Sequence, residues 1–581
     1  MRVTDTSDLW WKTAVFYNLD VETYLDWNDD GVGDLEGLAH RLDHLAELGV
    51  TCLWLAPFYP SPQRDNGYDI SDYFGVDPRY GHLGDFVEVV RTAKDRGMRV
   101  IVDLVVNHTS DQHPWFRAAR SDRDSRYRDF YTWRDEVPAD QPANMFPDVE
   151  DGVWSFDDEA GQYYRHSFYS HQPDLATDRQ EVRDEIAKVI GFWLQLGIDG
   201  FRVDAVPHLI DTDDGAEHGF LQALRGYVAR RSGSGMMLGE VNLPYDEMVA
   251  FFGEDDGDEL TMQFDFVANQ ALYLSLARQD ARPLAAALST RPTLARGNQW
   301  GNFVRNHDEL TLDQLSDDER DEVFEAFAPL ESQRIHGRGI VRRLPPMLDG
   351  DPRRIRMVYS LMFSTPGAPV LFYGEEIGMG ENPAVSGRGA VRTPMQWTDE
   401  AGGGFSRAEA DDLVAPLAVE GWAPEHVNVS RQRHEPDSML RFVQSLVRHY
   451  RASPEIGWGE LTLLDSGHDC VLAHAVVSST GTLVAVHNFA PDGRSVDLDL
   501  SGLLGPDAGE AGAVGEAGAV GEAAGAAAGH AAGAAAPRLV DLLAERSVPE
   551  ALAGDAHHRI ELEGYGFRWL RVLRAGEKRL V

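Results

Sequence analysis

The sequence predicts an α/β fold, a (β/α)8 barrel with a lid subdomain inserted after its third strand and an antiparallel β-sandwich domain behind it. Two observations lead to this prediction. Over residues 14–202, short runs of branched and aromatic residues alternate with amphipathic segments that end in glycine, which is typical of strand–helix repeats around a parallel sheet. After the helical segment 438–450, the pattern changes to alternating strands such as residues 482–489, which indicates a second, all-β domain.

The barrel strands are expected where the chain is apolar enough to be buried on both faces. Such runs, together with the strand before Asp204, give eight candidates, the number that closes a barrel of this kind. The candidates are residues 14–21, 52–58, 100–106, 200–203, 236–241, 260–266, 301–304 and 369–373.

The helices between the first strands are predicted from leucine spacing and from terminal glycines. Leucines recur at spacings of three and four over residues 35–48, and Gly49 closes this helical stripe. A second helix is expected to end at Gly97. A third follows the apolar residues of 182–194 and stops at Gly197, just before the strand that carries Asp204.

The domain boundaries follow from these breaks in pattern. We expect the barrel to comprise residues 1–108 and 179–455, because the polar and aromatic stretch 109–178 is too long for an ordinary loop and should form the inserted subdomain. Residues 456–581 form the predicted sandwich domain. Within it, residues 505–537 are nearly all Ala, Gly and Glu, a composition expected of a flexible loop.

Composition excludes several classes of partner. A formal net charge of -42 disfavours nucleic acid and anionic membranes, both of which need a positive surface. No run of apolar residues is long enough to span a bilayer, so we expect a cytoplasmic protein without a membrane partner. The two cysteines, Cys52 and Cys470, do not suggest disulfides. The oligomeric state stays open, a homo-oligomer included.

Carboxylates follow several of the predicted strands, where the chemistry of such barrels takes place. Asp103, Asp204, Glu240 and Asp308 all fall at or near strand ends. A single Asp at such a place is often a helix cap or a surface charge. Arg202, however, lies two residues before Asp204, so both side chains share one face of the strand and the guanidinium can hold the carboxylate ionised. A glycosidic bond can be cleaved by two such carboxyl groups.

Four segments, in this order, resemble the signature regions of the alpha-amylase superfamily, glycoside hydrolase family 13: residues 103–108, 200–206, 238–242 and 303–308. The resemblance extends from about Trp10 to Trp569 and implies the TIM barrel fold. It implies Asp204 as the nucleophile, Glu240 as general acid and base, and Asp308 as the third carboxylate. The substrate-binding residues that it implies are Asp65, Tyr68, His108, Arg202, His307 and Arg392, with Asp65 and Arg392 paired around a terminal glucose.

A calcium site is expected in residues 26–34, where oxygen-bearing side chains alternate around a glycine turn, an arrangement suited to a hard cation. The loop lacks the closing Glu of an EF-hand, and a solvated acidic turn is the alternative. The resemblance supports structural Ca2+ and no organic cofactor. The ligands that it implies are Asp26, Asn28, Asp30, the carbonyl of Val32 and Asp34 at one site, and Asn107, Asp174, the carbonyl of Leu209 and Asp211 at a second.

Two activities remain open within the resemblance. Residues 106–116, 170–175 and 308–312 are most similar to trehalose synthases, which isomerise maltose to trehalose through a covalent glucosyl-Asp intermediate. Residues 201–204 and 65–68 are more similar to alpha-glucosidases, which would hydrolyse maltose, sucrose or short alpha-glucans. A non-catalytic ancillary barrel or a carbohydrate-binding protein is a further alternative, but the three carboxylates are intact. In each case the expected partner is a small sugar.

Overall fold

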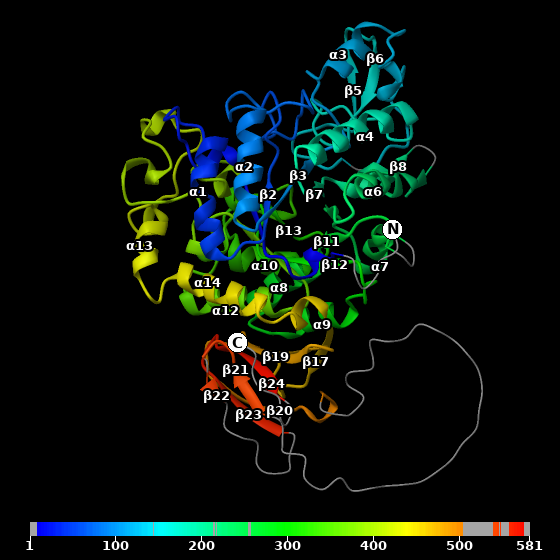
Figure 1. Cartoon of the computed structure of the whole chain (residues 1–581). Coiled ribbons are helices and arrows are strands. Elements are labelled where there is room, and N and C mark those ends of the chain that lie inside the picture. The colour runs from blue at the N-terminus through cyan, green and yellow to red at the C-terminus, as the bar shows by residue number, and fades with distance from the viewer. Residues whose placement is uncertain are drawn as a thin grey trace, which may run out of the picture.

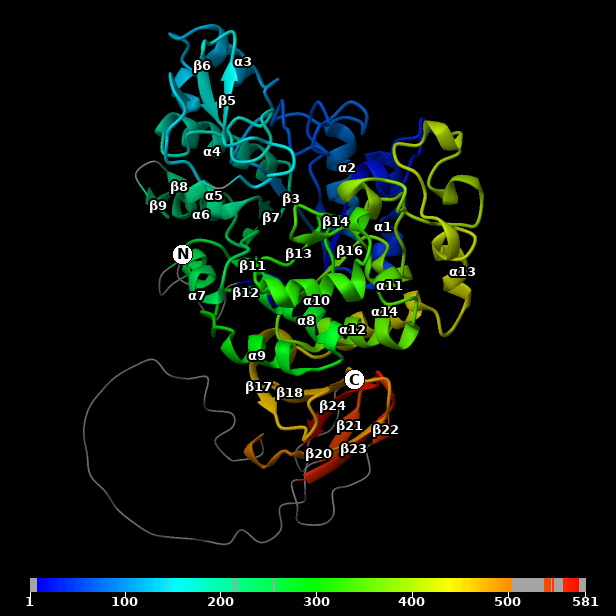
Figure 2. The same cartoon turned by 180° about the vertical axis from the view of Figure 1, so that it is seen from behind.

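The computed structural model describes residues 8–142, 144–212, 215–216, 218–253, 257–503, 538–544, 546–547 and 557–573. In Figure 1 the barrel occupies the centre, the inserted subdomain with α3 and β6 lies beyond one end of it, and the β-rich C-terminal region lies beyond the other. Figure 2 shows the same order from behind. The predicted low-complexity loop at 505–537 lies outside the described residues. No helix in the described ranges is long and apolar enough to cross a membrane.

A closed barrel of parallel strands forms the core of the molecule, as predicted. Its order around the ring is β1-β16-β12-β11-β10-β7-β3-β2, and β2 pairs with β1 to close it. All eight predicted strands are present and differ from the expected ranges only at their ends. Their bounds are β1 Phe16–Leu19, β2 Cys52–Leu55, β3 Arg99–Leu104, β7 Gly200–Val203, β10 Met236–Gly239, β11 Met262–Phe264, β12 Gln299–Phe303 and β16 Ala368–Phe372.

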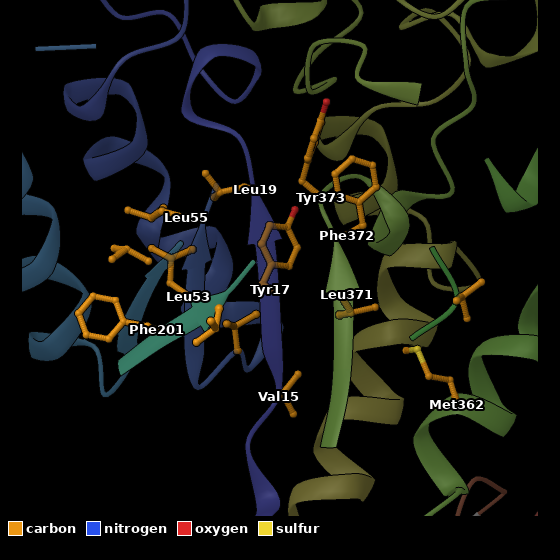
Figure 3. Close-up of a cluster of buried hydrophobic side chains, with 14 of the residues drawn as sticks. Val15, Tyr17, Leu19, Leu53, Leu55, Phe201, Met362, Leu371, Phe372 and Tyr373 are labelled. Atoms are coloured by element: carbon orange, nitrogen blue, oxygen red, sulfur yellow. The ribbon is translucent and has the colours of Figure 1, made fainter. Parts of the chain in front are cut away.

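Alternate residues of each strand face opposite sides of the barrel wall, because side chains on a strand alternate. Phe16 of β1 belongs to the cluster that fills the barrel, with Trp54 and Val370. Its neighbours Val15, Tyr17 and Leu19 belong instead to the larger cluster outside (Figure 3). In that figure, Leu53 and Leu55 of β2 and Leu371 of β16 join the same outer layer, which the surrounding helices cover. Burial on both faces explains why the sequences of these strands are continuous apolar runs.

Helices surround the barrel and begin and end largely where the sequence predicts. Gly49 ends α1 with a φ of 93°, a left-handed conformation that glycine adopts without steric cost. The bounds of the helices that flank the barrel are α1 Leu35–Leu48, α2 Leu83–Asp95, α4 Gln180–Gln195, α5 Val206–Ile210, α6 Gly219–Arg231, α7 Tyr245–Met248, α8 Phe266–Arg278, α9 Arg282–Thr290, α10 Asp317–Phe327, α11 Leu344–Met347, α12 Pro352–Ser364, α13 Val429–His434 and α14 Met439–Arg451.

Small antiparallel sheets lie above the carboxyl ends of the barrel strands. The segment after β3 contains α3 Pro114–Ser121 and a sheet of order β4-β6-β5, with bounds Trp133–Arg134, Gln162–Arg165 and Trp154–Asp157. A second sheet of order β13-β15-β14 follows β12, with bounds Leu310–Thr311, Gly339–Ile340 and Arg334–Ile335. A short hairpin joins β8 Asp211–Thr212 to β9 Gly215–Ala216.

The C-terminal region is a two-layered β structure. A sheet of order β17-β18-β19-β24-β21-β22 packs through Val484, Leu570 and Val572 against the pair β20-β23, which contributes Val496 and Ile560. The short α15, Glu455–Trp458, precedes it. The strand bounds are β17 Glu460–Leu464, β18 Val471–Ser478, β19 Gly481–Asn488, β20 Arg494–Asp499, β21 Arg538–Asp541, β22 Arg546–Ser547, β23 His557–Leu562 and β24 Phe567–Leu573.

Two buried histidines join this region to the barrel helix α12. The Nε2 atom of His487 lies 2.9 Å from Oγ of Ser360, to which Trp569 Nε1 donates at 3.0 Å. His474 donates through Nε2 to the carbonyl of Ser364 at 3.0 Å. Burial lowers the pKa of His474 to about 4 and holds the pKa of His487 well below its ordinary value. Both rings are therefore neutral at neutral pH, and the interface is built for their neutral form.

We expect this interface to be acid-sensitive. An unfolded histidine takes up a proton near pH 6.5, whereas these two cannot do so while folded, so the unfolded state binds more protons below that pH. Stability should therefore be fully present above about pH 6.5 and fall toward pH 4, by at most about 1.4 kcal/mol per pH unit for each histidine. Thermal unfolding at pH 7.5, 6.0 and 5.0 should show a smaller pH dependence for His474→Gln than for wild type.

The matched control for this variant is His434→Gln, at the exposed end of α13. Its pH dependence should equal that of wild type. Equal losses of stability on acidification in wild type and His474→Gln would contradict the assignment of this sensitivity to His474.

Candidate active site

One buried guanidinium gathers three carboxylates at the carboxyl end of the barrel. Arg202, on β7, is 1% exposed. Its Nη1 donates to Oδ1 of Asp103 and to Oδ1 of Asp204, both at 2.6 Å, and its Nη2 donates to Oε2 of Glu240 at 2.7 Å. The carboxylates come from three neighbouring strands, β3, β7 and β10. The two predicted catalytic residues, Asp204 and Glu240, are thus brought together on one cation.

The backbone between β7 and α5 fixes this arrangement. Asp204 is the first residue after β7, and Ala205 follows it with a φ of 46°, a left-handed conformation that is uncommon for a residue with a Cβ. The amide of Ala205 donates to Oε2 of Glu240 at 3.3 Å, while the amide of Glu240 donates to the carbonyl of Val203 at 3.1 Å. Glu240 is therefore placed by the strand end that carries Asp204.

The electrostatics of this pair favour retention of a proton. Burial raises the pKa of Asp204 above its ordinary value and outweighs the opposing charge of Arg202. Burial also raises the pKa of Glu240, and the charges of Asp204 and Asp308 raise it further. Two carboxyl groups that share a site do not both ionise readily, so one proton on the pair is favoured. A general acid next to an ionised nucleophile needs that distribution.

The third carboxylate, Asp308, is held ionised by basic side chains. Its Oδ1 lies 3.0 Å from Nη1 of Arg388 and 3.0 Å from Nη2 of Arg392, and its Oδ2 lies 3.2 Å from Nε2 of His307. Burial by itself would raise the pKa of Asp308, but Arg388, His307 and Arg392 together hold it well below its ordinary value. Asp308 is thus a fixed negative charge with no proton to give.

Aromatic and imidazole rings form the wall beside these groups. Tyr68 lies parallel to His307, with ring centroids 5.6 Å apart, and its hydroxyl is 2.7 Å from Nε2 of His307. His108 lies with Nε2 3.2 Å from the carbonyl of Tyr68. All three are buried. The structure therefore places the predicted substrate-binding residues Tyr68, His108 and His307 in one contiguous wall next to Arg202.

Asp65 and Arg392 have different partners from those that the sequence led us to expect. Oδ2 of Asp65 accepts a hydrogen bond from Nε2 of Gln172 at 2.8 Å, whereas Arg392 contacts Asp308 and donates to the carbonyl of His307 at 2.7 Å. Burial raises the pKa of Asp65 to about 6, opposed first by Arg388 and only later by Arg392. Asp65 and Arg392 thus lie in one electrostatic neighbourhood without being each other's direct partner.

Sequence reasoning named Asp103 only as a carboxylate near a strand end, and it missed Gln172 and Arg388. Asp103 takes hydrogen bonds from Arg202 and, at 2.6 Å, from Trp54 Nε1, and burial raises its pKa to about 6. It lies opposite Arg202 in the β3–β7 register, which one sequence does not report. Gln172 lies on an irregular segment, and Arg388 lies in the 3-10 helix Gly387–Val391. Arg388 did carry a signal, because it precedes Arg392 by four residues, but it was not recognised.

The loop 26–34 is folded around its acidic residues. Asp26 accepts from the amides of Asp29 at 2.7 Å and Gly31 at 2.8 Å, and Asp34 caps α1 by accepting from the amide of Gly37 at 2.7 Å. Asp26 and Asp34 are buried. Among the described residues no basic side chain pairs with Asp26, Asp30 or Asp34. The buried carboxylates of Asp26 and Asp34 accept from neutral amide and hydroxyl groups, so a cation in this loop would offset charge that no basic side chain offsets.

The residues of the second predicted calcium site have other hydrogen-bond partners in the structure. Asp174 accepts from Asn107 Nδ2 at 3.2 Å and from Ser167 Oγ at 2.6 Å, and Arg165 Nε lies 3.7 Å away. The carbonyl of Leu209 accepts from Thr177 Oγ1 at 3.1 Å. The side chain of Asp211 lies outside the described residues. Unlike the acidic side chains of the loop 26–34, Asp174 has a basic side chain, Arg165, beside it.

A comparison with known families agrees with this geometry. The model of the alpha-amylase catalytic domain matches residues 21–329 and 342–459. The chain belongs to the alpha-amylase family. The match includes the barrel strands from β2 to β16 and all three candidate catalytic carboxylates, so the protein is a glycoside-active enzyme of this family rather than a barrel that has lost its reactive groups.

Curated relatives and solved structures extend the comparison. The chain is 40% identical over 504 residues to the trehalose synthase/amylase TreS of Mycobacterium tuberculosis, covering 84% of each chain. It is 28% identical over 546 residues to the oligo-1,6-glucosidase of Parageobacillus thermoglucosidasius, covering 83% of this chain and 91% of that protein. The crystal structure of the trehalulose synthase MutB from Pseudomonas mesoacidophila is 25% identical, with a TM-score of 0.73, and covers 97% of this chain and 99% of that one.

Replacement of the predicted nucleophile gives a direct test of the site. We expect Asp204→Ala to lower kcat on an alpha-glucoside substrate by about a thousandfold or more, because loss of a covalent catalyst costs several powers of ten. Initial rates of wild type and Asp204→Ala measure the effect, and their circular dichroism spectra verify that both are folded. Activity above about a thousandth of wild type would place the nucleophile elsewhere.

Proposed function

We propose that this protein is a trehalose synthase, which interconverts maltose and trehalose through a covalent glucosyl ester on Asp204. The observation that carries the proposal is the pairing of Asp204 and Glu240 on Arg202, with Asp308 held apart as a permanent anion. One carboxylate can attack while its neighbour carries the proton. The relative named trehalose synthase is also more similar to this chain than the glucosidase, at 40% against 28% identity.

The first half of the proposed reaction breaks the bond between the two glucose units. Asp204 attacks the anomeric carbon of the non-reducing glucose, and Glu240 gives its proton to the departing O4 oxygen. Asp308 and Arg392 hold hydroxyl groups of the same glucose. Arg202 keeps Asp204 aimed and accepts no proton, because a guanidinium stays charged at any physiological pH.

The second half reverses these roles. The freed glucose turns and presents its anomeric hydroxyl, Glu240 takes the proton from that hydroxyl, and the new oxygen–carbon bond displaces Asp204. Two successive inversions at the anomeric carbon of the transferred glucose leave its configuration unchanged. If water attacks instead, the products are two glucose molecules, and the enzyme is an alpha-glucosidase. The similarity to oligo-1,6-glucosidase keeps that outcome as the alternative.

We also propose that the loop 26–34 binds a structural Ca2+. The oxygens of Asp26, Asn28, Asp30 and Asp34 and the carbonyl of Val32 would hold the ion, in keeping with the oxygen ligands that calcium prefers. The ion would neutralise buried acidic groups at the start of α1. It has no part in the proposed bond cleavage, because two carboxylates suffice for that chemistry.

Incubation with maltose tests the proposed activity. Proton NMR should show trehalose as the main product and free glucose as a minor one, with Asp204→Ala as the blank. If the product is mostly glucose, the enzyme is an alpha-glucosidase and not a synthase. If no product forms, sucrose, isomaltose and longer glucans are tested next.

Calcium removal tests the proposed metal site. We expect excess EDTA to lower the melting temperature of wild type and added Ca2+ to restore it, because a ligand at about 100 times its dissociation constant stabilises by about 2.7 kcal/mol. Asp26→Ala should abolish the response to calcium. Asp158→Ala, which removes an exposed carboxylate of the insert, should keep that response. An unchanged response in Asp26→Ala would contradict a site in this loop.

A further inference from the structure

Glu375 is a buried carboxylate that lies outside the catalytic group. It begins the 3-10 helix Glu375–Ile377, which follows β16, and it is 4% exposed. Its Oε2 accepts from the amide of Phe372 at 2.9 Å. Its Oε1 makes no hydrogen bond to the part of the chain that the structure describes. A buried carboxylate with a free oxygen is costly, so positive charge nearby is needed to stabilise its ionised form.

Two buried arginines supply that positive charge. Arg305 lies between β12 and Asp308, Arg343 is the residue before α11, and each arginine is 2% exposed. Burial raises the pKa of Glu375 to about 7, and the charges of Arg343 and Arg305 oppose this rise. Nη1 of Arg305 and Nη2 of Arg343 have no hydrogen-bond partner among the described residues. Within the described structure the three side chains therefore interact by charge and not by hydrogen bonds to one another.

The other nitrogens of Arg305 hold the backbone of the third carboxylate. Its Nη2 donates to the carbonyl of Asp308 at 2.7 Å, and its Nε donates to the carbonyl of Arg342 at 2.8 Å. Residues 304–309 form neither helix nor strand, so the hydrogen bonds of the barrel sheet do not fix this carbonyl. The guanidinium of Arg305 therefore fixes the backbone position of Asp308.

Arg343 makes the matching connection to Arg392, the partner of Asp308. Its Nε donates at 2.9 Å to the carbonyl of Val391, the residue directly before Arg392. Nη2 of Arg392 in turn lies 3.0 Å from Oδ1 of Asp308. The backbones of both members of this ion pair are thus held by arginines whose charges act on one carboxylate, that of Glu375.

We propose that Glu375 is a positioning residue that keeps Asp308 and Arg392 in place for bond cleavage. It acts through the guanidiniums of Arg305 and Arg343, which it attracts while it is ionised. Without its charge the two buried guanidiniums repel each other uncompensated, and the backbones that they hold shift. Asp308 then binds the hydroxyls of the reacting glucose less tightly in the transition state. This inference rests on the proposed role of Asp308 in cleavage, a step that the synthase and the alpha-glucosidase share.

The charge of Glu375 changes near neutral pH, whereas its surroundings keep theirs. The charged groups that act on it among the described residues are Arg343 and Arg305, which stay protonated at any physiological pH. Tyr359 on α12 and Tyr273 on α8 also lie beside these arginines, and burial raises the pKa of both hydroxyls. Acidification below about pH 7 should therefore remove the negative charge of Glu375 and leave the charges around it unchanged.

The experiment compares wild type with Glu375→Gln, which keeps the size of the side chain and removes its charge. Release of fluoride from alpha-glucosyl fluoride measures kcat/KM, because fluoride leaves with little help from a proton donor. We expect kcat/KM of wild type to exceed that of the variant about tenfold at pH 8, since a displacement of about 1 Å can cost up to a hundredfold. This ratio should fall toward one at pH 5.5, where Glu375 is protonated and resembles glutamine.

Glu376→Gln is the matched control, because it removes a buried charge from the next residue of the same 3-10 helix. Oε1 of Glu376 accepts from Tyr17 at 2.9 Å and lies 3.0 Å from Nε2 of His44. The ratio of wild type to this variant should be the same at pH 5.5 and pH 8. Glu375→Asp keeps the charge and should lose less activity at pH 8 than Glu375→Gln. Circular dichroism and melting temperatures verify that all variants are folded.

A second measurement tests the route through the third carboxylate. In an Asp308→Ala background, Glu375→Gln should change kcat/KM at pH 8 by less than about threefold, because the residue on which it acts is gone. An equal loss in both backgrounds would contradict positioning of Asp308.

The outcomes distinguish this inference from the function on which it rests. If wild type exceeds Glu375→Gln by the same factor at pH 5.5 and pH 8, the carboxylate has only a structural role and the inference is wrong. Fluoride release with the expected pH dependence, but no trehalose from maltose, would overturn the synthase and support the role of Glu375. No fluoride release by wild type would overturn both.

Discussion

The site depends on one interaction, the guanidinium of Arg202 shared by Asp103, Asp204 and Glu240. A single positive charge cannot fully compensate three buried negative charges, so the group is stable only if at least one proton stays on it. Burial is the main cause of the raised pKa values of Asp204 and Glu240, and the excess of carboxylate over guanidinium raises them further. The same excess supplies the proton that the departing oxygen needs.

The barrel makes this crowding possible. Each of the three carboxylates and the arginine is anchored by backbone pairing of β3, β7 and β10, in which Asp103 lies opposite Arg202 and Gly239 opposite Val203. Repulsion between carboxylates would separate them on flexible loops. On paired strands they cannot move apart without breaking the sheet, and the apolar clusters on both sides of the wall oppose that. Hydrophobic burial thereby sustains an electrostatic arrangement that is unfavourable by itself.

The features that could be predicted from the sequence are those that depend on residues close together in the chain. The barrel strands and the helix ends at Gly49 and Gly97 were predictable, because apolar runs and terminal glycines act within a few residues. The Asp204 and Glu240 pair was identified by the motifs around it. Asp103 as a partner of Arg202 requires the β3–β7 register, and Arg388 beside Asp308 requires the packing of a short 3-10 helix against a loop. No periodic pattern encodes either, since both depend on tertiary contacts between distant segments.

The use of arginine throughout the site has a chemical consequence. Asp308 is paired with Arg388 and Arg392, and Asp204 and Glu240 share Arg202. A lysine in such a buried position would itself lose its proton readily, whereas a guanidinium does not. The proton of the site therefore moves only among carboxyl groups and sugar hydroxyls. In both halves of the reaction Glu240 can give and recover that proton while every positive charge around it stays constant, so the same geometry serves cleavage and reattachment alike.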